Sequence, residues 1–203
     1  MAAEMSHARA PAASTIWGLV TIASTATALF SYRYLADVGP LSPSVLSNLF
    51  RRPWLDVHVA GAATALLLGP LQFLPAPRRT PLHKTLGRVY VVSCLAGGLA
   101  GLVLAFGSTA GAIATVGFAG LAISWIAAVL LGWRAAVNRH FGRHRAWMIR
   151  AFALTFAAVT LRIYLLAIPV LPVPALDAYR AISFLCWLPN LLFAELYLRE
   201  NGA

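Results

Sequence analysis

Charge is what this sequence has least of. Only 11% of its 203 residues are Asp, Glu, Lys or Arg, whereas about 25% is usual in a soluble domain. Apolar residues make up 60% of the chain, and the mean hydropathy is +0.76. A soluble domain of this size cannot bury so many apolar side chains, because roughly half or more of any folded surface stays exposed, and a disordered chain has far fewer of them. The composition therefore predicts a polytopic membrane protein.

Acidic residues, lysine and cysteine are also scarce. Six acids stand against sixteen basic residues, of which Lys84 is the one lysine, so the net charge is +10. The arginines lie between long apolar runs, which indicates topology signals and contacts with anionic lipid headgroups rather than a nucleic-acid partner. Cys94 and Cys186 fall inside apolar runs and form no disulfide framework. Neither a Ser-His-Asp grouping nor a glycine-rich phosphate loop is present, so hydrolase and nucleotidase activities are not expected.

Six apolar stretches are long enough to cross a membrane, which takes about 20 residues as a helix. They are Ala13–Tyr32, Trp54–Leu74, Pro81–Phe106, Ala110–Trp133, Arg145–Ile168 and Tyr179–Leu198. Backbone groups in lipid need hydrogen bonds within their own segment, so the predicted fold class is all-α: a six-helix membrane bundle forming a single domain over residues 1–203. Residues 1–12 are expected to be a flexible tail. The first stretch also resembles a signal peptide with a small-x-small site at Ala26–Ala28, but its length favours a retained helix.

Loop charges predict the orientation of the bundle. One side holds ten basic residues: Arg9, Arg78, Arg79, Lys84, Arg88, Arg134, Arg139, Arg143, Arg145 and Arg199. The other side holds four: Arg33, Arg51, Arg52 and Arg180. The positive-inside rule then places both termini in the cytoplasm. The outer loop 36–53 is expected to carry a short interfacial helix over Ser44–Phe50.

Polar groups inside a membrane span are costly, so those present are informative. In the second span they share one helix face with small residues, in the order His58, Ala62, Ala65, Gly69, Gln72. The fifth span repeats this pattern with His144, Met148, Ala151, Thr155, Ala158 and Arg162. Because these two spans run in opposite directions, we expect Arg162 to meet His58 and Asp56 at the outer level, and His144 to meet Gln72 at the inner level.

The third and sixth spans add further polar groups at inner-leaflet depth. The face of the third span runs through His83, Gly87, Tyr90, Cys94, Gly97 and Gly101, with Arg88 beside it. In the sixth span Pro189 predicts a kink, and Glu195 falls at the level of Arg150. Two interpretations remain open: the small residues allow close helix packing, or the faces line a cavity with polar ends. Arg162 lies among apolar residues and needs an anion, either Asp56 or the carboxylate of a ligand.

His83 and His144 are predicted at the same depth on different helices. Two such imidazoles can ligate a haem iron axially, and Lys84, Arg88 or Arg150 could then pair with its propionates. A quinone headgroup among His83, Arg88, Gln72 and His144 is the alternative cofactor. A structural zinc site is not expected, since no Cys pair lies inside a span.

The motifs His58-x-x-Gly61, His83-x-x-x-Gly87-Arg88-x-Tyr90 and His144-Arg145-x-Trp147-Met148-Ile149-Arg150, together with Gln72, Trp125 and Arg162, resemble a known family. This family comprises bacterial predicted membrane proteins and is catalogued as domain of unknown function twenty-three-oh-six. The resemblance extends over about residues 54–168, which form a core of four helices. The resemblance implies an integral protein of the inner membrane and no established activity. The sequence is also loosely similar to four-helix membrane cytochromes with b-type haem, but it lacks their two stacked histidine pairs.

Three hypotheses follow. The first is a protein that binds a redox cofactor, b-type haem or quinone, in a polar-ended cavity between the second, third and fifth spans. Its candidate binding residues are His58, Gln72, His83, Arg88, Tyr90, His144, Arg150 and Arg162, with His83 and His144 as metal ligands. The second is a non-enzymatic scaffold or assembly factor. The third is a small-molecule carrier, against which the sequence shows no inverted repeat and no clearly broken helix.

Overall fold

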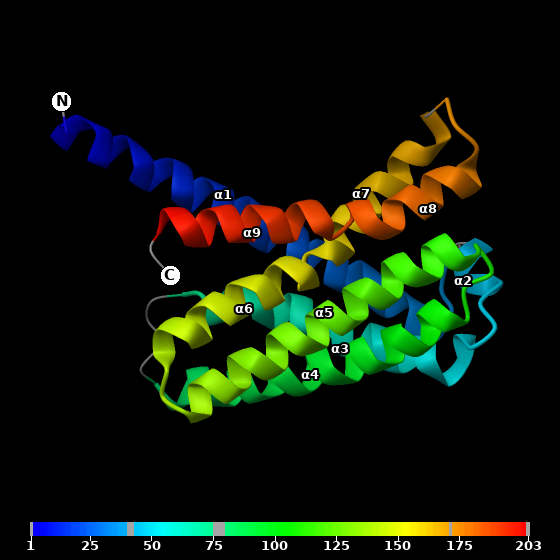
Figure 1. Cartoon of the computed structure of the whole chain (residues 1–203), viewed down its shortest axis with the longest axis horizontal. Helices are drawn as coiled ribbons and strands as arrows, with labels where there is room; N and C mark the ends of the chain where they lie inside the picture. The colour runs from blue at the N-terminus through cyan, green and yellow to red at the C-terminus, as the bar shows by residue number, and fades with distance from the viewer. Residues whose placement is uncertain (1, 40–42, 75–79, 171, 202–203) are drawn as a thin grey trace.

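The fold consists of helices throughout the described residues of the computed structural model, which are 2–39, 43–74, 80–170 and 172–201, with side chains described from residue 15 onward (Figure 1). The α-helices are α1 (Ala2–Ser31), α2 (Pro43–Leu46), α3 (Arg51–Gln72), α4 (Pro81–Phe106), α5 (Ala112–Val137), α6 (Phe141–Thr155), α7 (Ala157–Ala167), α8 (Ala175–Leu185) and α9 (Leu188–Glu200). Two short 3-10 helices, η1 (Tyr32–Ala36) and η3 (Ile168–Val170), follow α1 and α7.

Six helical segments are long and apolar enough to span a membrane, as the sequence predicts. The first and last spans have their chain-terminal ends at the same end of the bundle, opposite α2 (Figure 1). The predicted interfacial helix appears as the single turn α2, somewhat earlier than expected. Helix α1 extends back to Ala2, so it includes most of the segment predicted as a tail.

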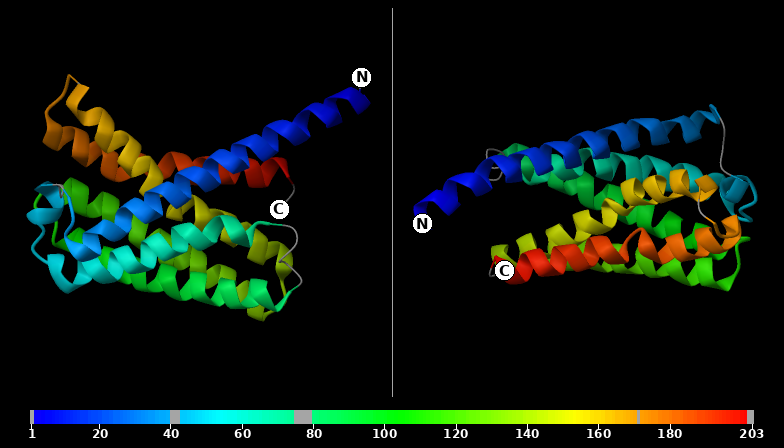
Figure 2. Two further views of the ribbon diagram at one scale, coloured as in Figure 1. Left: turned by 180° about the vertical axis from the view of Figure 1, so that it is seen from behind. Right: turned by 90° about the horizontal axis from the view of Figure 1, so that it is seen from above.

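Helices α3, α4, α5 and α6 form the centre of the bundle. Neighbours in the chain pack against each other, α6 also touches α3, and the remaining spans lie outside: α1 against α3, α8 against α5 and α9 against α6 (Figure 2). The contact between α3 and α4 is the closest, because glycines face each other across it. A Cβ atom built on Gly97 would lie 2.8 Å from the backbone nitrogen of Ala62, which is too close for any side chain. Part of the small-residue pattern therefore serves helix packing.

The fifth and sixth spans are each interrupted near the middle. The interruption beside Pro189 confirms the kink predicted there, whereas the one at Phe156 was not expected. Helix α6 ends at Thr155 and α7 starts at Ala157; α8 ends at Leu185 and α9 starts at Leu188, with Pro189 in its first turn. The side chain of Asn190 connects the two breaks. Its amide nitrogen lies 3.3 Å from the carbonyl oxygen of Ala153 and 3.0 Å from the hydroxyl of Thr160. Backbone groups freed by a break in lipid need such partners.

Candidate functional site

A cavity of about 270 Å³ opens between the central helices at the α2 end of the bundle. Five spans contribute to its wall: α3, α4, α5, the broken α6–α7 and α8, while η1 and α2 border its mouth. Its polar and charged lining residues are Tyr34, Ser44, Asn48, Arg51, His58, Ser108, Thr155, Arg162 and Tyr179. Most of the remaining wall is alanine, leucine and aromatic side chains. We call this space the central cavity.

His58 is held in the wall of the central cavity by α4. Its Nδ1 atom lies 2.8 Å from the carbonyl oxygen of Gly97. Because a carbonyl oxygen only accepts, Nδ1 carries the hydrogen, and Nε2 is left available to a ligand. The next small residue on α4 makes room for the ring: a Cβ atom on Gly101 would lie 2.9 Å from the same Nδ1 atom.

Arg162 lines the same cavity as His58, as expected of two residues predicted at one level, but its partners differ from those expected. One Nη atom donates to the hydroxyl of Ser31 at 2.7 Å, and the other donates to the carbonyl oxygen of Ala158 at 2.8 Å. Asp56 pairs with Arg52 at 2.8 Å and not with Arg162, so that part of the prediction was wrong. Among the described residues, no carboxylate lies within 4.0 Å of the Arg162 guanidinium. The guanidinium of Arg162 is therefore hydrogen-bonded, but no carboxylate of the described residues neutralises its positive charge.

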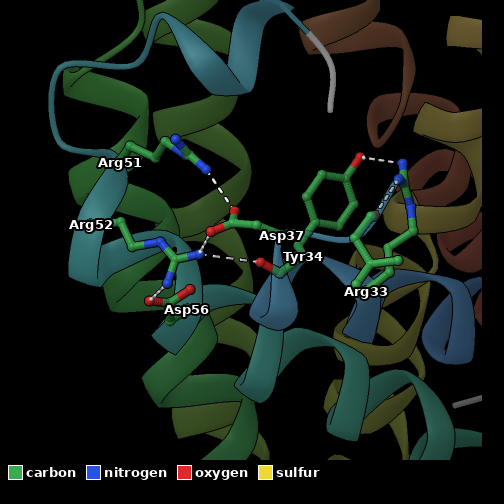
Figure 3. A network of polar contacts seen from close by, with 7 residues as sticks. Arg33, Tyr34, Asp37, Arg51, Arg52 and Asp56 are labelled. Carbon is green, nitrogen blue, oxygen red and sulfur yellow. Dashed lines mark hydrogen bonds and ion pairs between the residues drawn. The ribbon is translucent and has the colours of Figure 1, made fainter. Parts of the chain in front are cut away.

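Beside the central cavity, an ion-pair network connects the end of η1 to the start of α3 (Figure 3). Asp37, which directly follows η1, accepts from Arg51 and from Arg52, in both cases at 2.7 Å. Arg52 also donates to the backbone oxygen of Tyr34 at 3.5 Å. Tyr34 and Arg51 line the cavity, so this network fixes the η1 segment to the start of α3 beside its opening.

Below the cavity, Thr155 connects three helices. Its hydroxyl donates to the carbonyl oxygen of Ala151 and accepts from the indole nitrogen of Trp125 at 2.9 Å. The phenol oxygen of Tyr90 lies 3.0 Å from the same hydroxyl. Trp125 and Thr155 reach the cavity floor, whereas Tyr90, a predicted binding residue, is buried behind them.

The other predicted binding residues lie toward the opposite end of the bundle and do not line the central cavity. His83 is in the first turn of α4, and Arg88 is exposed farther along that helix. Gln72 is the last residue of α3, and its amide oxygen would lie 3.3 Å from a Cβ atom on Gly87. His144 donates through Nδ1 to the carbonyl oxygen of Gly132, 2.9 Å away.

Arg150 joins two helices through an ion pair and does not line the central cavity. Its guanidinium forms a two-point ion pair with Glu195 of α9, in which the second hydrogen bond measures 2.9 Å, and it lies over the ring of Trp147. This pair joins α6 to α9 at the level that the sequence assigns to both residues.

The predicted metal ligands, His83 and His144, both lie outside the lining of the central cavity. The helices that carry them have different main neighbours, since α4 packs chiefly against α3 and α6 packs chiefly against α5. Over the part of the chain that is described, no three His, Cys, Asp or Glu side chains gather as a metal site would require.

Three contributions to the cavity were not predicted from the sequence. Helix α5 supplies Phe118, Leu121, Ala122 and Trp125, helix α8 supplies Tyr179, and the η1–α2 segment supplies Tyr34 and Asn48. The α5 residues carry no charge, so polar patterning does not single them out. The outer loop was recognised as interfacial, but nothing in its composition places it over a cavity.

Comparison with known proteins places the chain in a family. No curated protein and no solved structure matches the sequence. The model of a family described as predicted membrane protein, DUF2306, matches residues 55–198. This range includes the sixth span, which the sequence-based resemblance over residues 54–168 left out. The chain, a multi-pass membrane protein with a cavity at one end of its bundle, belongs to the DUF2306 family of predicted membrane proteins.

Proposed function

We propose that this protein binds a small amphipathic molecule in the central cavity, with the polar head of the molecule held by Arg162 and His58. One observation carries the proposal: these two side chains face a space of about 270 Å³ whose remaining wall is largely apolar. A concave, mostly apolar space with a few convergent polar groups is the usual form of a small-molecule site.

The donors present define the chemistry of the head group. Arginine offers five N–H donors and no acceptor, and two of its nitrogens already bond to Ser31 and Ala158. The remaining N–H groups favour an oxygen that accepts hydrogen bonds, as in a carbonyl or a carboxylate. The apolar floor formed by Leu121, Ala122 and Leu154 favours hydrocarbon or a ring below that head.

Among redox cofactors, a quinone has this chemistry, because its ring carries acceptor oxygens and is otherwise apolar. The site therefore supports the quinone form of the cofactor hypothesis. Haem is not proposed, since His83 and His144 lie outside the cavity.

The experiment measures saturable binding of two probes, decylubiquinone and octanoate, to the full-length protein in lipid nanodiscs. Empty nanodiscs correct for partition into lipid. Ala122→Phe fills the cavity, and Ala127→Phe adds the same bulk to the exposed face of α5. We expect at least one probe to bind the wild type and Ala127→Phe, and to lose that binding in Ala122→Phe. Binding by neither probe, or equal binding by the two variants, would contradict the proposal.

The broken spans favour a second candidate, a small-molecule carrier. Transporters commonly build substrate sites where interrupted helices expose backbone groups near the middle of the membrane. Here α7, which begins after the break at Phe156, contributes Arg162 to the cavity. Uptake of a cavity ligand into sealed proteoliposomes, abolished by Ala122→Phe, would identify a carrier; binding without uptake would exclude one.

For location, we propose the bacterial inner membrane with both termini in the cytoplasm. The ten basic residues that the sequence assigns to that side support this orientation. They also support contact with anionic lipid headgroups there.

A further inference from the structure

We propose that the head group of the ligand is anionic, and that the central cavity takes an amphipathic carboxylate. This inference rests on the proposed function and narrows it to one class of ligand. It follows from the charges around the cavity, from the partners of Arg162 and from the size of the space.

The charges that line the central cavity are of one sign. Arg51 and Arg162 lie in its wall, together with His58, and the lining includes neither Asp nor Glu. The charge of Arg51 is balanced by Asp37 at 2.7 Å. Asp56, the remaining acid near the mouth, is occupied by Arg52. The site is therefore electropositive, and the uncompensated charge is that of Arg162.

Arg162 lies within a membrane span, where an uncompensated charge is costly and where arginines normally pair. The Ser31 hydroxyl and the Ala158 carbonyl satisfy two of its nitrogens, but both partners are neutral. The hydroxyl of Ser31 donates its one hydrogen to the carbonyl oxygen of Thr27 and brings no negative charge to Arg162. A carboxylate supplies the missing negative charge and accepts from the free edge of the guanidinium. A neutral quinone oxygen accepts hydrogen bonds there but leaves the charge in place.

The volume is compatible with a short apolar part. A cavity of about 270 Å³ has room for a medium-chain carboxylate such as octanoate. A head at Arg162 leaves the apolar chain to extend toward Trp125 and Leu154 at the cavity floor.

The test compares octanoate with 1-octanol, which has the same chain length and no charge, using full-length protein in nanodiscs of zwitterionic lipid. We expect octanoate to bind the wild type at least about tenfold more tightly, the gain typical of a charge-assisted hydrogen bond. Arg162→Gln should reduce this preference to near unity, whereas Arg162→Lys should keep part of it. Arg180→Gln is the matched control, because Arg180 pairs with Asp177 and does not line the cavity.

The possible results distinguish the anionic ligand from the binding site itself. If octanol or decylubiquinone binds as tightly as octanoate, and Ala122→Phe abolishes all binding, the anionic ligand is refuted and the binding site stands. If no probe binds saturably, both are refuted. The wild-type comparison of octanoate with octanol needs no variant, so a folding defect in Arg162→Gln cannot rescue the inference. Equal octanoate preference in properly folded Arg162→Gln and Arg180→Gln proteins would overturn the role of Arg162.

Discussion

Replacing Thr155 by valine tests the hydrogen-bonded centre of the bundle. The hydroxyl of Thr155 has one hydrogen and two lone pairs, and all three are used: it donates to Ala151 and accepts from Trp125 and Tyr90. Valine has nearly the same shape, so packing is retained while two donors from neighbouring helices lose their acceptor. The effect on stability therefore reports the polar contacts and little else.

The structure bounds the size of this effect. Interhelical hydrogen bonds in membrane proteins contribute about 0.6 kcal/mol on average, so the loss of two gives at least about 1.2 kcal/mol. A buried donor left without a partner costs about 1–3 kcal/mol, which places the upper end near 6 kcal/mol for the two. Because Trp125 and Thr155 border the cavity, water can reach the freed groups. We therefore expect the free energy of unfolding to fall by about 1–3 kcal/mol.

The measurement is reversible unfolding of the purified protein by SDS titration, followed by tryptophan fluorescence. Thr155→Ser, which keeps the hydroxyl, is the control for a change at this position. The double variant Thr155→Val, Tyr90→Phe should lose less than the two single losses added, because one stranded donor is then absent. If Thr155→Val and Thr155→Ser are equally stable within about 0.5 kcal/mol, the hydrogen-bonded centre contributes nothing and the reasoning fails.

Two further predictions concern packing and topology. Gly97→Ala places a Cβ atom 2.8 Å from the backbone of α3, so we expect a loss of about 1–3 kcal/mol from overpacking; Gly18→Ala, which meets nothing within 4 Å, should leave the midpoint of thermal unfolding unchanged or raise it. A green fluorescent protein fused after residue 203 should fluoresce and an alkaline phosphatase there should be inactive, because the positive-inside rule places this end in the cytoplasm; the reverse pattern would show that the orientation is inverted.

Within the site, the sequence predicted the depth of a side chain in the bundle better than its ion-pair partner. Arg162 and His58 were placed at one level by counting along two antiparallel helices, and both line the same cavity. Asp56 was placed at that level too, yet it pairs with Arg52 one turn away on its own helix. Residue spacing gives the height of a side chain along the bundle, but it does not show which of two arginines an acid will pair with.

The polar residues predicted at inner-leaflet depth also show that spacing gives depth but does not define a site. Arg150 and Glu195 were correctly assigned to one depth, and they form an ion pair between α6 and α9. The assignment of Gln72 and His83 to a shared cofactor site remains a prediction, since they lie away from the central cavity. Several polar residues at one depth do not define a site unless the helices leave a space between them.

The membrane class, the six spans and the polar faces of α3 and α7 could be predicted from the amino-acid sequence. They follow from composition and from the 3.6-residue period of a single helix, which are local properties. The packed structure was needed to show that the cavity lies at the α2 end, that α5 helps to line it, and that spans five and six break beside Asn190. Those features depend on the rotation and separation of different helices, which are set by contacts such as Gly97 against Ala62 between residues far apart in the chain.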